Sequence, residues 1–349
     1  MDSERIFVPK FHIQQSIKGC FSAMSKKRLL SGMQPTGLLH LGNLEGALAN
    51  WVTLQDEYEA FFFIANWHAL TTLHDKTDQI KLYTREVAID FLAAGLDPEK
   101  SAIFVQSDVI EHAELHMLFS MITPVGWLER VPTYKEKQDN IAMDSVSYGL
   151  LGYPVLQAAD ILMYKANAVP VGRDQIPHLE LSREIGRRFN YLYGNVFPDC
   201  EAKLTEFANM PGLDGRKMSK SYGNAIYLRD SNKETEDKVR TMYTDPLKAH
   251  KDSPGHPDGC AVYAMMKLYE TEEFQNLHAD CEAGRVGCMA CKKKLGKVLN
   301  ERLAPIRERR KTYEDNPALL DEVLASGADK ARKVARETME EVHNSMGMR

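Results

Sequence analysis

Four of the six cysteines lie close together along the chain, at Cys260, Cys281, Cys288 and Cys291. Their spacing is C-x20-C-x6-C-x2-C, and the short last gap lets one turn of backbone present two thiolates to the same metal. Four thiolates bind either a zinc ion or an iron–sulfur cluster, and the spacing alone does not separate the two. The sequence therefore predicts a metal site on these four residues.

A second group of residues suited to chemistry is the loop from Gly215 to Asn224, which contains the string Lys217-Met218-Ser219-Lys220-Ser221. Two lysines three positions apart, among small residues and flanked by glycines, form a cationic arm that can neutralise a triphosphate. In displacement at phosphorus a protein acts mainly by positioning and by charge stabilisation. The loop predicts adenylate formation, with Lys217 and Lys220 as catalytic residues.

A glycine-containing turn, Gly32 to Asn43, precedes the first predicted helix. Backbone N–H groups in such a turn can approach phosphates closely, and the start of a helix attracts anions. His40 and Asn43 add side-chain donors at this point. A turn of this kind is weak evidence alone, but together with the lysine loop it predicts a nucleotide site.

Hydrophobic periodicity gives the elements that must position these residues. Leu44, Ala47, Leu48 and Trp51 keep one face of a helix, as expected for an amphipathic element. Strands and helices alternate over the first hundred residues, which predicts an α/β fold with a Rossmann-like parallel sheet. The expected strands are Arg28 to Ser31, Ala60 to Ile64 and Ala102 to Gln106, and a further apolar stretch follows at Ala168 to Val171. The expected helices are 43–57, 77–94, 177–193 and one around 331–346.

A chain of 349 residues exceeds the size at which one hydrophobic core usually stops growing, so two structural regions are expected. We predict an N-terminal extension over 1–25, possibly disordered, with Met24 as a plausible true start. A Rossmann-like catalytic domain is expected over 26–230. A helical domain carrying the four cysteines is expected over 231–349, with its last helix packing back on the catalytic domain.

The net charge of −5 carries no global signal for nucleic acid, but Arg285 to Lys311 holds ten Lys or Arg residues against two acids. This basic run is either a solvated helix face or a surface for RNA. No apolar run approaches membrane-spanning length and no secretion signal is recognisable. Clustered cysteines fit a reducing cytoplasm, with Cys20 and Cys200 uninvolved in the metal site.

The pairing of His40-Leu41-Gly42-Asn43 with Lys217 to Ser221 resembles the two signatures of the class I aminoacyl-tRNA synthetases. Within that class the chain resembles the tryptophanyl-tRNA synthetases from about Arg28 to the C-terminus. The strings that carry this resemblance are Ser31 to Gly37, Leu128 to Arg130, Gln157 to Leu162 and Val169 to Gln175.

The resemblance implies activation of L-tryptophan with ATP and Mg²⁺, transfer to the 3′ end of tRNA(Trp), a helical anticodon-binding domain and a homodimer. For the cysteines it implies the [4Fe–4S] cluster of one bacterial branch, with zinc as the alternative. The x6 and x2 gaps match that branch, whereas the first gap is slightly short. A structural staple and a platform that positions the anticodon beside Lys292, Lys293, Lys294 and Lys297 are both expected roles, the staple being favoured.

The resemblance also implies the site residues. The tryptophan pocket would contain Asp160, Tyr153, Gln175, His68, Val169 and Val171. The ATP site would contain Gln34, Pro35, Thr36, His40, Gly42, Asn43, Gly172, Arg173, Asp174, Lys217, Met218, Ser219, Lys220 and Ser221. Indole has one N–H donor and no acceptor, so a fixed carboxylate such as Asp160 suits it.

Two residues depart from the pattern of the family: Gln157 stands where many bacterial members have methionine, and Arg173 stands where an acidic residue is usual. Lys135 or Lys137 is a further candidate for phosphate contact, with a helix-surface role at least as expected. The alternatives in function are a tyrosine-specific enzyme, another enzyme that adenylylates a small acid, and a non-catalytic, redox-responsive RNA-binding paralogue.

Overall fold

The computed structural model describes residues 26–131, 147–204, 209–269 and 276–349. Its centre is a parallel sheet of five strands in the order β3-β2-β1-β4-β5. The strands are β1 (Arg28–Met33), β2 (Glu59–Ile64), β3 (Ser101–Val105), β4 (Ala168–Val171) and β5 (Glu201–Leu204). The predicted α/β fold with a Rossmann-like sheet is confirmed. The N-terminal extension, Cys20, Met24, Lys135 and Lys137 lie outside the described residues.

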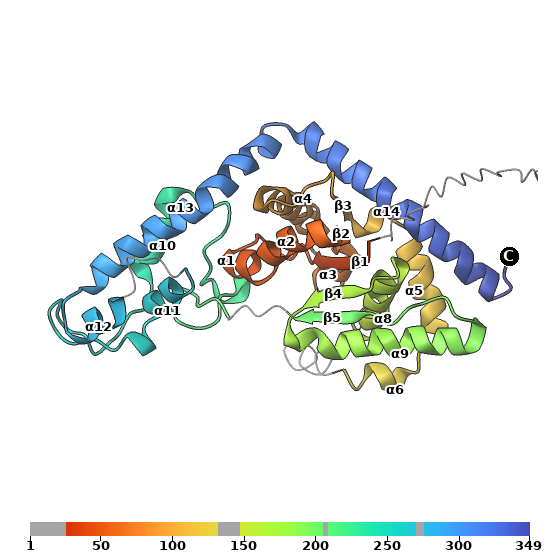
Figure 1. The fold of residues 1–349 in the computed structure, drawn as a ribbon, viewed down its shortest axis with the longest axis horizontal. Helices are drawn as coiled ribbons and strands as arrows, with labels where there is room; N and C mark the ends of the chain where they lie inside the picture. Colours follow the sequence, from red (N-terminus) through yellow and green to blue (C-terminus); the bar gives the residue numbers. More distant parts are fainter. Residues whose placement is uncertain (1–25, 132–146, 205–208, 270–275) are drawn as a thin grey trace, which may run out of the picture.

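Alternate side chains of β1 to β4 enter cores on opposite faces of the sheet. Phe62 and Ile64 belong to one core, and Phe61 and Phe63 belong to the other. Helices cover both faces (Figure 1), as the near-continuous apolar sequence of these strands requires. The helices of this region are α1 (Leu41–Asn43), α2 (Ala49–Glu57), α3 (Asn66–Leu73), α4 (Thr77–Ala94), α5 (Glu111–Ile122), α6 (Val125–Leu128), α8 (Tyr148–Met163) and α9 (Ile176–Tyr193).

The helix predicted over 43–57 starts two residues earlier and is not regular. A π-helical segment, Leu44–Leu48, separates α1 from α2. Such insertions widen one turn of a helix and often occur at functional sites. The helix predicted over 77–94 agrees with α4, which ends at Gly95 in the left-handed conformation (φ 116°) that glycine adopts without strain.

Downstream of the sheet the described chain is mostly helical: α10 (Asn232–Thr241), α11 (Ala261–Lys267), α12 (Leu277–Glu282), α13 (Cys288–Glu314) and α14 (Pro317–Ser345). Helix α10 starts at a capping box formed by Ser231 and Glu234. The two long helices α13 and α14 meet at an angle, and α14 runs back along the sheet (Figure 1).

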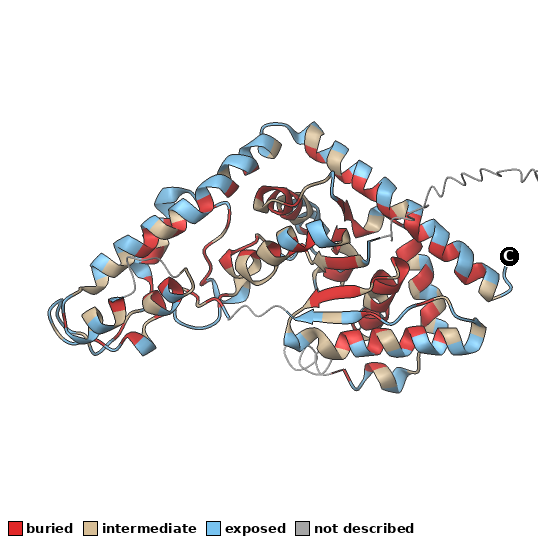
Figure 2. Ribbon diagram, viewed as in Figure 1, coloured by how far each residue is buried: buried red, intermediate tan, exposed pale blue. Residues whose placement is uncertain are grey.

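Helix α14 lies directly against β3, and Figure 2 shows its buried residues on the side that faces the sheet. Gly327 permits the close approach, because a Cβ at this position would lie 1.9 Å from the carbonyl oxygen of Ile103. A larger residue would therefore push the helix away from the strand. Among the described residues, no helix is long and apolar enough to cross a membrane.

Candidate active site

A cavity of about 330 Å³ opens at the carboxyl ends of β1 and β4. Strand order reverses between these two strands, and in open α/β sheets ligands bind at such a switch point. The cavity brings together all six residues of the predicted tryptophan pocket. Those residues are His68, Tyr153, Asp160, Val169, Val171 and Gln175.

The walls of this cavity are mixed in character. Phe63 and the valines of β4 supply apolar surface, and Gln157 also lines it. Gly32 is needed for this wall, because a Cβ there would lie 2.6 Å from the ring of Phe63. The amide of Gln157 adds a polar group to a pocket that is otherwise suited to a flat aromatic ligand.

Asp160 lies at the bottom of the cavity and is almost completely buried. Its Oδ2 atom is 2.7 Å from Nε2 of His68. Its Oδ1 atom accepts from Nε2 of Gln106 at 2.8 Å and lies 2.6 Å from Nδ1 of His112. Burial alone would raise the pKa of Asp160, but the hydrogen bonds from His112 and His68 outweigh it and lower the pKa to about 2. Asp160 is therefore an anionic acceptor at neutral pH.

The glycine-containing turn and the segment that follows the lysine loop are held together by backbone hydrogen bonds. The N–H of Leu41 donates to the carbonyl of Ile226, and the N–H of Leu228 donates to the carbonyl of Leu39, both at 3.0 Å. Nζ of Lys220 then reaches the carbonyl of Gly37 at 2.9 Å. Two motifs far apart in sequence thus form one cationic wall.

His40 precedes α1, and its backbone N–H donates to Oδ1 of Asn43 at 3.1 Å. Its ring lies over Gly42, where a Cβ would come within 3.0 Å of the imidazole. Nδ1 of His40 is buried and has no hydrogen-bond partner among the described residues. Burial, together with the charges of Lys220 and Lys217, lowers the pKa of His40 to about 4. His40 is thus a neutral donor or acceptor at pH 7.

The lysine loop divides its residues between the interior and the surface. Met218 is buried and its N–H donates to the carbonyl of Met210 at 2.8 Å. Lys217 and Ser221 are exposed, whereas Ser219 and Lys220 are half-buried. Burial lowers the pKa of Lys220 to about 8, against an opposing effect of Asp90. Lys220 is the lysine that faces the turn, because its Nζ donates to the carbonyl of Gly37 while Lys217 is exposed.

The other residues predicted for ATP form the rim. Gln34 and Gly172 line the cavity itself. Arg173 and Asp174 are exposed, and Oδ2 of Asp174 accepts from the side chain of Gln175 at 2.8 Å. Pro35, Thr36, Gly42 and Asn43 do not line the cavity but belong to the turn that joins it to the lysine loop.

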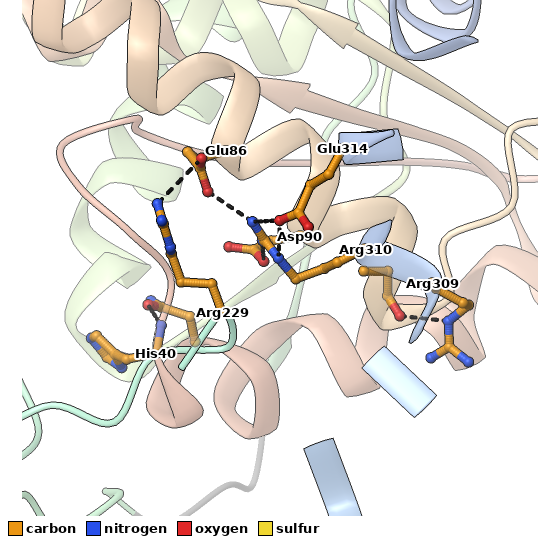
Figure 3. Close-up of polar contacts among 9 residues, drawn as sticks. His40, Glu86, Asp90, Arg229, Arg309, Arg310 and Glu314 are labelled. Carbon is orange, nitrogen blue, oxygen red and sulfur yellow. Dashed lines mark hydrogen bonds and ion pairs between the residues drawn. The ribbon is translucent and has the colours of Figure 1, made fainter. Parts of the chain in front are cut away.

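A cluster of charged groups fixes α13 to α4 beside this turn (Figure 3). Arg310 of α13 is buried and pairs with Asp90, with Glu86 at 2.8 Å and with Glu314 at 2.8 Å. Asp90 also accepts a hydrogen bond from the backbone of Leu39. Burial raises the pKa of Asp90 to about 7 even though Arg310 opposes this change.

The four cysteines line a second, smaller cavity at the start of α13. The free space between them is about 20 Å³, and within the described residues no group of three metal-binding side chains is already arranged to hold an ion. Burial raises the pKa of Cys281, and it raises that of Cys291 to about 11. Gly255 allows close contact, since a Cβ there would lie 2.6 Å from Sγ of Cys281.

The donor set of this cavity fits a thiolate-bound metal or cluster. Four sulfurs face one space whose other walls are largely apolar, and the negative charge of each thiolate would raise the pKa of its neighbours. A bound metal removes that repulsion, because it replaces the thiol protons.

Sequence reasoning missed the residues behind Asp160 and the cluster at Asp90. Gln106 directly follows β3, so its sequence position could have predicted that it lies at the carboxyl edge of the sheet, beside the cavity. Tyr164 directly follows the last residue of α8, four positions beyond Asp160, a spacing that allowed the two residues to share a face. Nothing in the sequence indicated that His112 of α5 joins them, or that Arg310 reaches Asp90.

Comparisons with known proteins agree on one family. Residues 23–304 match the family described as tRNA synthetases class I (W and Y). The tryptophan–tRNA ligase of Thermotoga maritima is 52% identical, over 92% of this chain and 99% of that protein. The tryptophan–tRNA ligase of Aquifex aeolicus is 44% identical, over 92% of this chain and all of that protein.

A solved structure gives the same result. The tryptophanyl-tRNA synthetase of Campylobacter jejuni, crystallised with ADP and tryptophan, is 38% identical and has a TM-score of 0.85. The match covers 92% of this chain and 99% of that one.

Proposed function

The chain belongs to the class I tRNA synthetases for tryptophan and tyrosine and is a tryptophan–tRNA ligase, and we propose that Asp160 recognises the indole N–H while the turn and lysine loop hold ATP. The observation that carries this proposal is a buried, ionised carboxylate at the bottom of a cavity of amino-acid size. A site built to receive a hydrogen bond leaves its acceptor unpaired when phenylalanine enters, so discrimination can be large without editing. Tyrosine has a phenolic O–H donor in place of the indole N–H, so its exclusion depends on the shape of the cavity and not on Asp160 alone.

In the first step the carboxylate of tryptophan attacks the α-phosphorus of ATP. The bond from that phosphorus to the bridging oxygen breaks, and pyrophosphate leaves with Mg²⁺. No general base is needed, because the attacking carboxylate is already ionised. Lys220 and Lys217 stabilise the charge that develops on the phosphates, and neutral His40 together with the backbone of the turn orients them.

In the second step a hydroxyl of the 3′-terminal ribose of tRNA(Trp) attacks the carbonyl of the adenylate, and AMP leaves. A groove of about 1130 Å³ between α10 and α13 supports a role for the helical region in holding the tRNA. Lys292, Lys293, Lys294 and Lys297 line it together with Arg240. Basic groups of this kind neutralise phosphates and strengthen binding at low salt.

Lys220→Ala tests the assignment of the lysine loop. The substitution removes a cation from the developing pyrophosphate, so adenylate formation should fall by about 10²-fold or more while the affinity for tryptophan changes little. Tryptophan-dependent pyrophosphate exchange and equilibrium binding measure the two quantities. Lys233→Ala, an exposed lysine of α10, is the matched control. An unchanged rate of adenylate formation in Lys220→Ala would contradict the assignment.

For the cysteine site we favour a [4Fe–4S] cluster over zinc, held by Cys260, Cys281, Cys288 and Cys291. Its position at the start of α13, away from the catalytic cavity, supports a structural role in which it staples the helical region. Iron, acid-labile sulfide and zinc should be measured on anaerobically purified protein. Near four iron and four sulfide per chain supports the cluster, whereas zinc alone would replace it. Cys288→Ser should weaken tRNA charging and leave adenylate formation largely intact, and Cys200→Ser is its control, because Cys200 is buried elsewhere.

A homodimer is supported by exposed apolar side chains on neighbouring helices. Met117 and Met121 of α5, Val125 of α6 and Tyr148 of α8 are each more than half exposed. Apolar groups gathered in this way mark surfaces for association. Sedimentation should give a dimer for the wild type and a monomer for Met117→Glu combined with Met121→Glu. The cytoplasm is the proposed location, since ATP and tRNA are supplied there.

A further inference from the structure

The two oxygens of Asp160 have different surroundings. Among the residues that the structure describes, Oδ1 has two partners, the amide of Gln106 and the imidazole of His112, while Oδ2 has only His68. His68 and Asp160 line the cavity, whereas Gln106 and His112 do not. Oδ2 is therefore the oxygen that retains acceptor capacity on the side of the ligand.

The groups behind Oδ1 form a directed chain. A carboxylate only accepts, so Nδ1 of His112 must carry its proton and donate it to Asp160. In a neutral ring Nε2 is then an acceptor, and the hydroxyl of Tyr164 lies 2.7 Å from it. Burial raises the pKa of Tyr164 well above its ordinary value, so the phenol keeps its proton and donates.

Packing holds this chain in one geometry. Asp160, His112, Tyr164 and Gln106 are each 0–1% exposed. The ring of Tyr164 is stacked on Phe61 with centroids 4.5 Å apart. The backbone N–H of Trp67 donates to Oε1 of Gln106 at 3.1 Å, which fixes the direction of the amide. None of these groups can turn without breaking a buried hydrogen bond.

We propose that Tyr164 and His112 are positioning residues for amino-acid selection, which hold Asp160 as a fixed anion with Oδ2 directed at the indole N–H. This inference rests on the proposed recognition of the indole by Asp160. Without the hydroxyl of Tyr164, Nε2 of His112 is a buried acceptor with no donor. The ring can then turn and release Oδ1. A carboxylate that is no longer held at Oδ1 presents Oδ2 less precisely to the indole N–H.

Tyr164→Phe tests this proposal, because it removes one oxygen and keeps the ring. The control is Tyr193→Phe, which removes a phenol oxygen from a residue packed against the same core, away from Asp160. The probes are L-tryptophan and L-β-(3-benzothienyl)alanine, in which sulfur replaces the indole N–H. Pyrophosphate exchange gives kcat/KM for each probe, and their ratio measures what the N–H contributes.

The wild type and Tyr193→Phe should prefer tryptophan by about 10²-fold, the range of a hydrogen bond to a charged group. In Tyr164→Phe this preference should fall by about tenfold, through a lower kcat/KM for tryptophan alone. The KM for ATP should not change. Equal losses for both probes would mean a structural role only, and an unchanged ratio in a folded variant would overturn the proposal.

Two further variants keep the outcomes separate. His112→Asn retains an N–H that can donate to Oδ1 but breaks the link to Tyr164, so it should lower the ratio as Tyr164→Phe does. Asp160→Asn should bring the ratio close to one. A wild-type ratio close to one would mean that the proposed recognition by Asp160 is itself wrong. A ratio that falls only in Asp160→Asn would leave that recognition intact and reject the positioning role.

Discussion

Asp160 and Asp90 are each 1% exposed, yet burial leads to opposite results at the two sites. Asp160 is surrounded by donors and has a pKa of about 2, while Asp90 beside an arginine has a pKa of about 7. Arg310 must serve three carboxylates, since Glu86 and Glu314 share it with Asp90. The charge of a buried carboxyl thus depends on how many donors and cations it has to itself, and not on burial alone.

The two sites also differ in what they do for the enzyme. One oxygen of Asp160 can still accept a hydrogen bond from a ligand in the cavity. Asp90, in contrast, is enclosed between α4, α13 and the turn at Leu39. The first arrangement suits recognition, and the second suits a joint between the helical region and the catalytic turn. Helix α13 carries Cys288 at one end and Arg310 near the other, so the same helix joins the cysteine cavity to this joint.

The largest expected effect in this comparison is that of Arg310→Met. Removing the cation leaves Asp90 without its ion-pair partner in the interior, and a broken buried ion pair costs about 3–5 kcal/mol. Denaturant unfolding measures the loss, with Arg187→Met at an exposed ion pair as the control. A loss below 1 kcal/mol would mean that the cluster is not the joint described here.

Asp160→Asn should affect selection more than folding. Replacing the anion with an amide should lower kcat/KM for tryptophan by about 10²-fold, the effect of losing a charged acceptor. Asp199→Asn, at an exposed ion pair, is the control. Pyrophosphate exchange and thermal unfolding measure both quantities, and full activity in Asp160→Asn would contradict its role in recognition.

The pKa of Lys220 predicts how adenylate formation depends on pH, and Asp90 influences that pKa. Its pKa of about 8 means that the protonated, active form is lost as pH rises through 8, so kcat/KM for ATP should fall about tenfold per unit above that value. The fall should be absent in Lys220→Arg, which stays protonated. In Asp90→Asn it should begin at lower pH, because Asp90 raises the pKa of Lys220. If the pH profile of Asp90→Asn were identical to that of the wild type, Asp90 would have no effect on the pKa of Lys220.

A pH-dependent effect on stability is expected between pH 4 and 7. Asp90 has a raised pKa in the folded state, so the folded protein binds more protons than the unfolded chain over this range and loses stability as pH rises. The slope contributed by one group is at most about 1.4 kcal/mol per unit. Asp90→Asn should remove this decline. Asp160→Asn should keep it, because Asp160 loses its charge only as pH falls from about 4 toward 2. Urea unfolding at several pH values distinguishes them.

The sequence was sufficient wherever a motif is local. Strand and helix periodicity placed the first three strands of the sheet but not β5, whose residues are mostly polar and exposed. Lys217 to Ser221 and the four cysteines were recognisable from spacing. Contacts between distant segments could not be predicted from the sequence. The contact of His112 with Tyr164 and that of Arg310 with Asp90 have no periodic or local pattern in the sequence. The π-helical segment at Leu44–Leu48 was also missed, because apolar spacing alone does not distinguish one widened turn from a regular helix.

The most direct test of the account is pyrophosphate exchange by the wild-type enzyme with L-tryptophan, L-tyrosine and L-β-(3-benzothienyl)alanine. If Asp160 selects the amino acid by accepting the indole N–H, exchange should be fast with tryptophan and about 10²-fold less efficient with the benzothienyl compound, and a cavity shaped for indole should make exchange with tyrosine negligible. Comparable exchange with the benzothienyl compound, or efficient exchange with tyrosine, would contradict this account of the site.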